Sequence, residues 1–170
     1  MLNFLFRRLT AEPSRGEALF ETATSEARRT HWYREGAVPD SLDGRFAALS
    51  TILALILVRL EREGDAGNPA SVALTERFIE VMESEHRELG LGDPTLGRTV
   101  RKLVGSLARR TQIWRSTVSA PNSWEDAVRQ SLYQGEPEED AVDHSMIALM
   151  EIWSRLEGTR LAELAEGHLK

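Results

Sequence analysis

The segment from Phe46 to Val58 constrains this chain more than any other feature, because it is apolar on nearly every side of a helix. Leu55 and Val58 fall on one side of that helix. The opposite side carries apolar residues at steps of three and four: Phe46, Leu49, Leu53, Ile56 and Leu60. A helix that is apolar nearly all round must be covered by other helices, so this segment predicts the centre of a bundle.

The same segment is too short to cross a membrane. It is interrupted by Ser50 and Thr51 and ends at Arg59, whereas a span needs about 20 apolar residues. Residues 1–9 are rich in Leu and Phe but lack the charge order and cleavage site of a secretory signal. We expect residues 1–13 to form an N-terminal arm that packs on the body, with an amphipathic membrane contact as the alternative.

Prolines and capping residues divide the remainder into helices. Asn68-Pro69 and Asp93-Pro94 are typical helix starts, and Pro39 favours a turn or extended connector. We therefore expect residues 14–170 to form one all-α domain, a bundle of about six helices with short loops and mostly antiparallel neighbours. The helices are expected at about 14–31, 42–63, 68–89, 93–118, 124–133 and 138–165, the last disturbed at Gly158.

Composition and motifs argue against several functional classes. The net charge of -6 is opposite to that of a dedicated DNA-binding protein. The absence of cysteine excludes disulfides, thiolate nucleophiles and Cys-ligated zinc. There is no phosphate-binding loop, nucleophile elbow or His-Glu-x-x-His motif. We expect neither catalysis nor a cofactor.

Two alternatives use the histidines. Glu83 and His86 have the Glu-x-x-His spacing of di-iron bundles, and Asp143 with His144 is the best second half, although its spacing differs. A ferritin-like metalloprotein is therefore one alternative. A haem-handling protein that uses His31 or His144 as an axial ligand is another.

Two surfaces are candidates for binding a partner. The expected helix 93–118 carries four cations within a sector of roughly 80°, opposite an apolar side: Arg98, Arg101, Lys102 and Arg109. This basic strip is either a solvated face or a surface for phosphates or acidic segments. Trp32, Tyr33 and Arg34 beside the Pro39 connector either plug the end of the bundle or form a binding hot spot.

Three segments resemble the ubiquinol–cytochrome c chaperone family. They are Trp32-Tyr33-Arg34-Glu35 with Val38-Pro39-Asp40-Ser41-Leu42-Asp43-Gly44-Arg45-Phe46, then Gly90-Leu91-Gly92-Asp93 before the basic helix, then Ser131-Leu132-Tyr133-Gln134-Gly135. The resemblance covers about residues 18–135, and Gly36-Ala37 departs from the Trp-Gly expected there.

The resemblance implies a helical, non-enzymatic chaperone for assembly of the respiratory bc1 complex. Its partner would be newly made cytochrome b, with a small partner subunit, the ribosome and the inner membrane as further contacts. The short N-terminus resembles a bacterial member, peripheral at the cytoplasmic face of the inner membrane. On this basis we expect eight partner-binding residues: Trp32, Tyr33, Val38, Asp40, Asp43, Arg45, Phe46 and Asp93. The basic strip would face the ribosome or the membrane.

Overall fold

The computed structural model describes residues 16–90, 92–120 and 123–169. Their elements are, in chain order, α2 (Glu17–Ala27), α3 (His31–Arg34), α4 (Leu42–Glu61), the 3-10 helix η1 (Gly64–Ala66), α5 (Asn68–Glu88), α6 (Asp93–Thr117), α7 (Trp124–Leu132), α8 (Glu139–Gly158) and α9 (Leu161–Ala165). These residues form helices and no strand, so the prediction of one all-α domain is confirmed. The expected N-terminal arm, residues 1–13, lies outside them.

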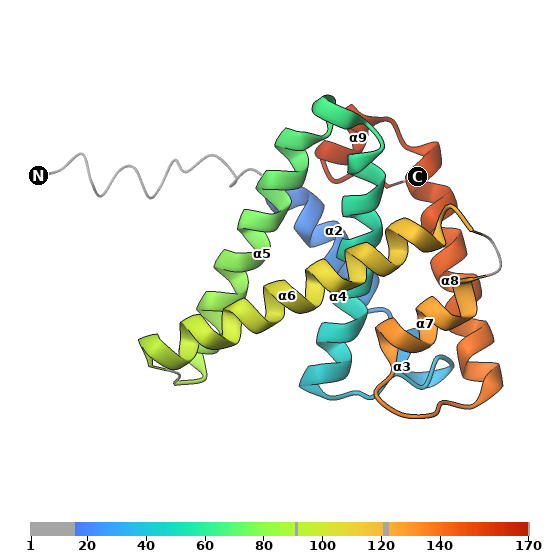
Figure 1. The fold of residues 1–170 in the computed structure, drawn as a ribbon, viewed down its shortest axis with the longest axis horizontal. Coiled ribbons are helices and arrows are strands. Elements are labelled where there is room, and N and C mark those ends of the chain that lie inside the picture. The colour runs from blue at the N-terminus through green and yellow to red at the C-terminus, as the bar shows by residue number, and fades with distance from the viewer. Residues whose placement is uncertain (1–15, 91, 121–122, 170) are drawn as a thin grey trace, which may run out of the picture.

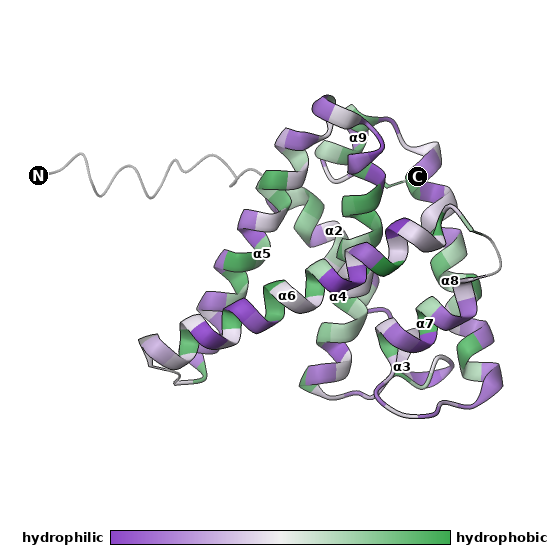
Figure 2. Ribbon diagram, in the orientation of Figure 1, coloured by the Kyte–Doolittle hydropathy of each residue, from purple (hydrophilic) through white to green (hydrophobic). Residues whose placement is uncertain are grey.

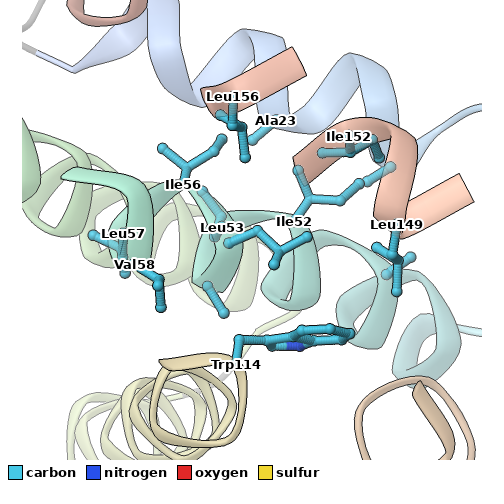
Figure 3. Close-up of a cluster of buried hydrophobic side chains, with 14 of the residues drawn as sticks. Ala23, Ile52, Leu53, Ile56, Leu57, Val58, Trp114, Leu149, Ile152 and Leu156 are labelled. Atoms are coloured by element: carbon cyan, nitrogen blue, oxygen red, sulfur yellow. The ribbon is translucent and has the colours of Figure 1, made fainter. Parts of the chain in front are cut away.

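Helix α4 is the centre of the bundle, as its apolar pattern predicted. It contacts α2, α5, α6, α7 and α8 (Figure 1). In the close-up, Trp114 of α6 covers one side of α4, while Ile152 and Leu156 of α8 lie on the other (Figure 3). Burial on both sides accounts for a segment that is apolar nearly all round.

Helices α5 and α6 form a long hairpin whose tip projects from the rest of the molecule (Figure 1). The tip is mostly hydrophilic, whereas α4 is largely hydrophobic (Figure 2). Helix α6 crosses α4 instead of running alongside it (Figure 1). The crossing carries Leu107 and Trp114 of α6 into the core.

The first predicted helix is wrong at its C-terminal end. Helix α2 stops at Ala27, and α3 is a separate turn. The indole Nε1 of Trp32 donates to the carbonyl of Glu26 at 2.8 Å, and the Tyr33 hydroxyl donates to that of Ala27 at 2.7 Å. These two side chains satisfy carbonyls at the end of α2, which lets the chain fold back there.

The last predicted helix is also two helices, because α8 ends at Gly158 where a disturbance was expected. Thr159 and Arg160 are extended, and α9 follows. The buried Arg59 of α4 donates to the carbonyls of Leu156 and Thr159 at 3.0 and 3.2 Å. Among the described residues, no helix has the length and apolar character needed to cross a bilayer.

Candidate partner-binding site

The connector between α3 and α4 depends on a close approach at Gly44. A Cβ at this position would lie 1.9 Å from the Pro39 carbonyl oxygen, so only glycine fits without moving the backbone. Ser41 caps α4 by accepting from the Gly44 amide at 3.2 Å. Arg45 Nε donates to Asp40 Oδ1 at 2.7 Å. Contacts within the Val-Pro-Asp to Gly-Arg-Phe block therefore hold its conformation, and they require these residues at this spacing.

The connector residues divide into a buried set and an accessible set. Trp32 and Val38 are each only 1% exposed and belong to the core. In this conformation neither side chain is accessible to a partner. They instead hold the connector in place. Asp40, Asp43 and Arg45 are exposed and accessible to a partner.

Tyr33 and Phe46 are half-buried. Burial raises the pKa of the Tyr33 hydroxyl, so this group stays a neutral donor at physiological pH. The Phe46 ring lies 6.3 Å from that of Phe78, between centroids. The guanidinium carbon of Arg110 lies 5.9 Å from the Phe46 ring centroid. Phe46 thus contacts the core and still has accessible surface.

A groove of about 280 Å³ lies between α4, α6 and the C-terminal end of α7. We call it the α4–α6–α7 groove. Its walls are Asp43, Phe46, Ala47, Lys102, Leu103, Ser106, Arg110, Ser131, Leu132, Tyr133 and Gln134. The groove brings together residues of the connector block, the basic helix and the Leu-Tyr element, which are far apart in the sequence.

Arg110 is the groove residue that our sequence analysis missed. It is 8% exposed, and its Nε and Nη2 donate to the carbonyl of Ser131 at 3.1 and 2.8 Å. Its Nη1 donates to Ser106 Oγ at 2.5 Å. Burial, followed by the charge of Arg109, lowers the pKa of the guanidinium to about 10. The sequence did carry a signal, because Arg110 lies in the apolar stripe between Leu107 and Trp114, at steps of three and four.

Tyr133 links the groove to the connector and to α8. Its hydroxyl lies 2.6 Å from the Gly36 carbonyl, 3.1 Å from that of Ala141 and 2.9 Å from Ser145 Oγ. Burial raises the pKa of Tyr133, as it does for Tyr33. The Leu-Tyr element therefore has a positioning role, because one hydroxyl fastens three segments.

The four residues of the basic strip are all exposed, and none takes part in an ion pair within the described residues. Lys102 also lies at the groove, so the strip and the groove are continuous. The side chain of Asp93 lies outside the described part of the chain. The contact of Asp93 with a partner therefore stays a prediction.

The structure does not bring together the four residues of the alternative metal site. Glu83 and His86 are on α5, whereas Asp143 and His144 are on α8, on the other side of α4 (Figure 1). No cluster of three or more His, Asp or Glu side chains suited to an ion occurs among the described residues. His31 Nδ1 and His144 Nε2 lie 3.0 Å apart, so the two proposed haem ligands form a hydrogen bond with each other.

Comparison with known proteins identifies the family. The crystal structure of the Cbp3 homolog from Brucella abortus matches with a TM-score of 0.77 and 24% identity, covering 100% of this chain and 96% of that one. At this identity the likeness shows a shared fold. No curated protein sequence matches the chain. The model of the family described as ubiquinol-cytochrome C chaperone matches residues 34–169, well beyond the last motif that suggested it. This chain therefore belongs to the ubiquinol–cytochrome c chaperone family.

Proposed function

We propose that the protein assists assembly of the ubiquinol–cytochrome c reductase complex by binding newly made cytochrome b. Family membership supports a role in assembling this complex. The observation that carries the finer proposal is the groove, where the first and third segments of the family resemblance meet helix α6 around a partly apolar surface. A groove with both apolar walls and charged groups suits an apolar polypeptide that is not yet assembled.

Binding alone is enough for this role. Cytochrome b is apolar and is prone to aggregate before its assembly. A protein that binds the immature form stabilises it by mass action, by about 2.7 kcal/mol when the chaperone is a hundredfold above its dissociation constant. Such a mechanism requires no nucleotide, which agrees with the lack of a phosphate-binding loop.

The basic strip supports a second part of the proposal. Arg98, Arg101 and Arg109 are exposed on an otherwise acidic protein and form no ion pair within the described residues. They would hold the chaperone at a phosphate-rich surface, either the anionic inner membrane or ribosomal RNA, where cytochrome b emerges. We place the protein in the bacterial cytoplasm, peripheral at the inner membrane. A small partner subunit would complete the complex.

Filling the groove tests client binding. Ser106→Phe adds a ring inside the groove, and Ala108→Phe adds the same ring to an exposed position of the same helix outside it. Tagged full-length variants are purified from the host, and co-purified cytochrome b is measured by mass spectrometry. Ser106→Phe should lose cytochrome b while Ala108→Phe retains it. Equal recovery with both variants would refute the groove as the client site.

Charge reversal tests the basic strip. Arg98, Arg101 and Arg109 are replaced together by Glu, and a control replaces the exposed Arg28, Arg87 and Arg160. Both variants have the same net charge. Only the first should lose co-sedimentation with phosphatidylglycerol vesicles or ribosomes. Loss in both variants would mean that net charge, and not this surface, controls the contact.

A further inference from the structure

Arg110 gives the α4–α6–α7 groove a buried positive charge without a counterion. It forms no ion pair within the described residues, and its charged neighbour along the helix, Arg109, has the same sign. Removing an ion from water is costly unless an opposite charge compensates for it. A cation of this kind in the wall of a groove is therefore suited to an anion supplied by whatever binds there.

The neighbours of Arg110 meet its hydrogen-bonding needs but not its charge. A guanidinium has five N–H donors. The recorded acceptors are the Ser131 carbonyl and the carbonyl and hydroxyl of Ser106, all uncharged. Ser131 also lines the groove, and its buried hydroxyl has no hydrogen-bond partner among the described residues. The Ser131 hydroxyl is therefore available for a hydrogen bond at this part of the groove wall.

The other groove residues indicate what accompanies the anion. Phe46, Leu103 and Leu132 contribute apolar surface. Lys102 and Asp43 are exposed and contribute one charge of each sign, so Arg110 leaves the groove with an excess of one positive charge. We infer that the groove binds an apolar peptide segment that carries a single aspartate or glutamate, whose carboxylate pairs with Arg110. The inference rests on the proposed function and specifies the client segment.

A carboxylate fits this position better than a phosphate. A carboxylate carries one charge, which matches the excess of one in the groove, and it can accept from the one Arg110 N–H that the chain's own acceptors leave over. A phosphate carries more charge and is better served by several exposed cations. Arg98, Arg101 and Arg109 of the basic strip offer such a set outside the groove.

The test begins with a photoreactive amino acid at Gln134, an exposed residue of the groove. The full-length protein is cross-linked in its host, and the attached segment of cytochrome b is identified by mass spectrometry. The segment should be apolar and contain one carboxylate. That residue is then changed to its amide, and Arg110 is changed to Gln, singly and together. Circular dichroism checks that each chaperone variant is folded, and Arg115→Gln is the matched control on the same helix.

Each single change should reduce recovery of cytochrome b about tenfold, because a charge-assisted pair of this kind is lost. The double change should cause little further loss, since both single changes remove one interaction. Additive losses, or no loss from the amide, would overturn the inference while leaving client binding intact. Failure of every cross-link to cytochrome b would refute the proposed function as well. Loss of vesicle binding in Arg110→Gln with unchanged client recovery would show that the anion is a phosphate, and would also overturn the inference.

Discussion

The two ends of the central helix α4 each lie beside a buried arginine, and the two arginines are in different electrostatic situations. Near the C-terminal end, Arg59 is 9% exposed, donates to two carbonyls at the end of α8 and pairs with Glu63 at 2.5 Å. Near the N-terminal end, Arg110 is 8% exposed, donates to a carbonyl at the end of α7 and pairs with no carboxylate of the described residues. Both cations stabilise a helix C-terminus, where the dipole is negative.

The different surroundings of the two arginines indicate that one end of α4 serves stability and the other serves binding. At the C-terminal end of α4, charge and hydrogen bonds are satisfied within the chain, so this end can be explained as structure alone. At the N-terminal end, the groove has an uncompensated charge and accessible apolar surface. We expect substitutions at the first end to affect stability alone, and substitutions at the second end to affect client binding as well. Four predictions test this contrast.

The largest effects are expected at two glycines that allow close backbone approaches. A Cβ at Gly67 would lie 2.0 Å from the Leu60 carbonyl oxygen, and one at Gly44 would lie 1.9 Å from that of Pro39. Gly67→Ala and Gly44→Ala should each reduce the free energy of unfolding by about 3 kcal/mol, because the backbone must shift. Urea denaturation followed by tryptophan fluorescence measures this loss. Per folded molecule, only Gly44→Ala should also capture less cytochrome b.

Next in size is the contrast between the two arginines. Arg59→Met removes the hydrogen bonds to the carbonyls of Leu156 and Thr159 and the ion pair with Glu63, and should reduce the free energy of unfolding by about 2 kcal/mol. Arg110→Met also loses hydrogen bonds but removes an uncompensated buried charge, so about 1 kcal/mol is expected. Urea midpoints give both values, with Glu157→Gln in an exposed ion pair as control. Equal losses would contradict the contrast.

A smaller effect concerns two residues with positive φ. Ala37, in the connector, has φ 46°, a region that favours glycine. Ala37→Gly should raise the free energy of unfolding by about 1 kcal/mol by relieving this strain. Gly64 near the other end of α4 has φ 58° and nothing within 4 Å of an added Cβ, so Gly64→Ala should lower it by a similar amount. Changes of the same sign in thermal melts would disprove this assignment.

The smallest effect is a pH dependence from α3, beside the connector. Burial and the nearby His144 lower the pKa of His31 below 6.5, the value for a free histidine. The unfolded chain therefore binds a proton more readily, so stability should fall as the pH drops below about 6.5. Urea midpoints at pH 5.5 and 7.5 measure the change. His31→Gln should show a smaller difference between these two pH values, and an identical difference would rule out this histidine as the source.

Local patterns predicted much of the fold. The period of the Phe46–Val58 segment indicated a buried central helix, and Pro69 marked the first turn of α5. The expected cap at Asn68 is wrong, because Gly67 is the N-cap and no side chain caps this helix. The other errors were the ends of α2 and α8. Both ends are set by donors from elsewhere, Trp32 and Tyr33 in one case and Arg59 in the other. A pattern within one helix cannot reveal a donor that arrives from another segment.

The sequence by itself determined the helices, the central position of α4 and the family, because periodicity, caps and motifs depend on residues close together in the chain. The groove was decided only by tertiary structure. Helix α6 crosses α4 and meets the end of α7, which buries Arg110 and leaves Arg109 exposed, one residue away. The same crossing places Asp43, Lys102 and Gln134 around one groove. The physical reason is that charge compensation and burial depend on which distant segments pack together, and not on the identity of a residue alone.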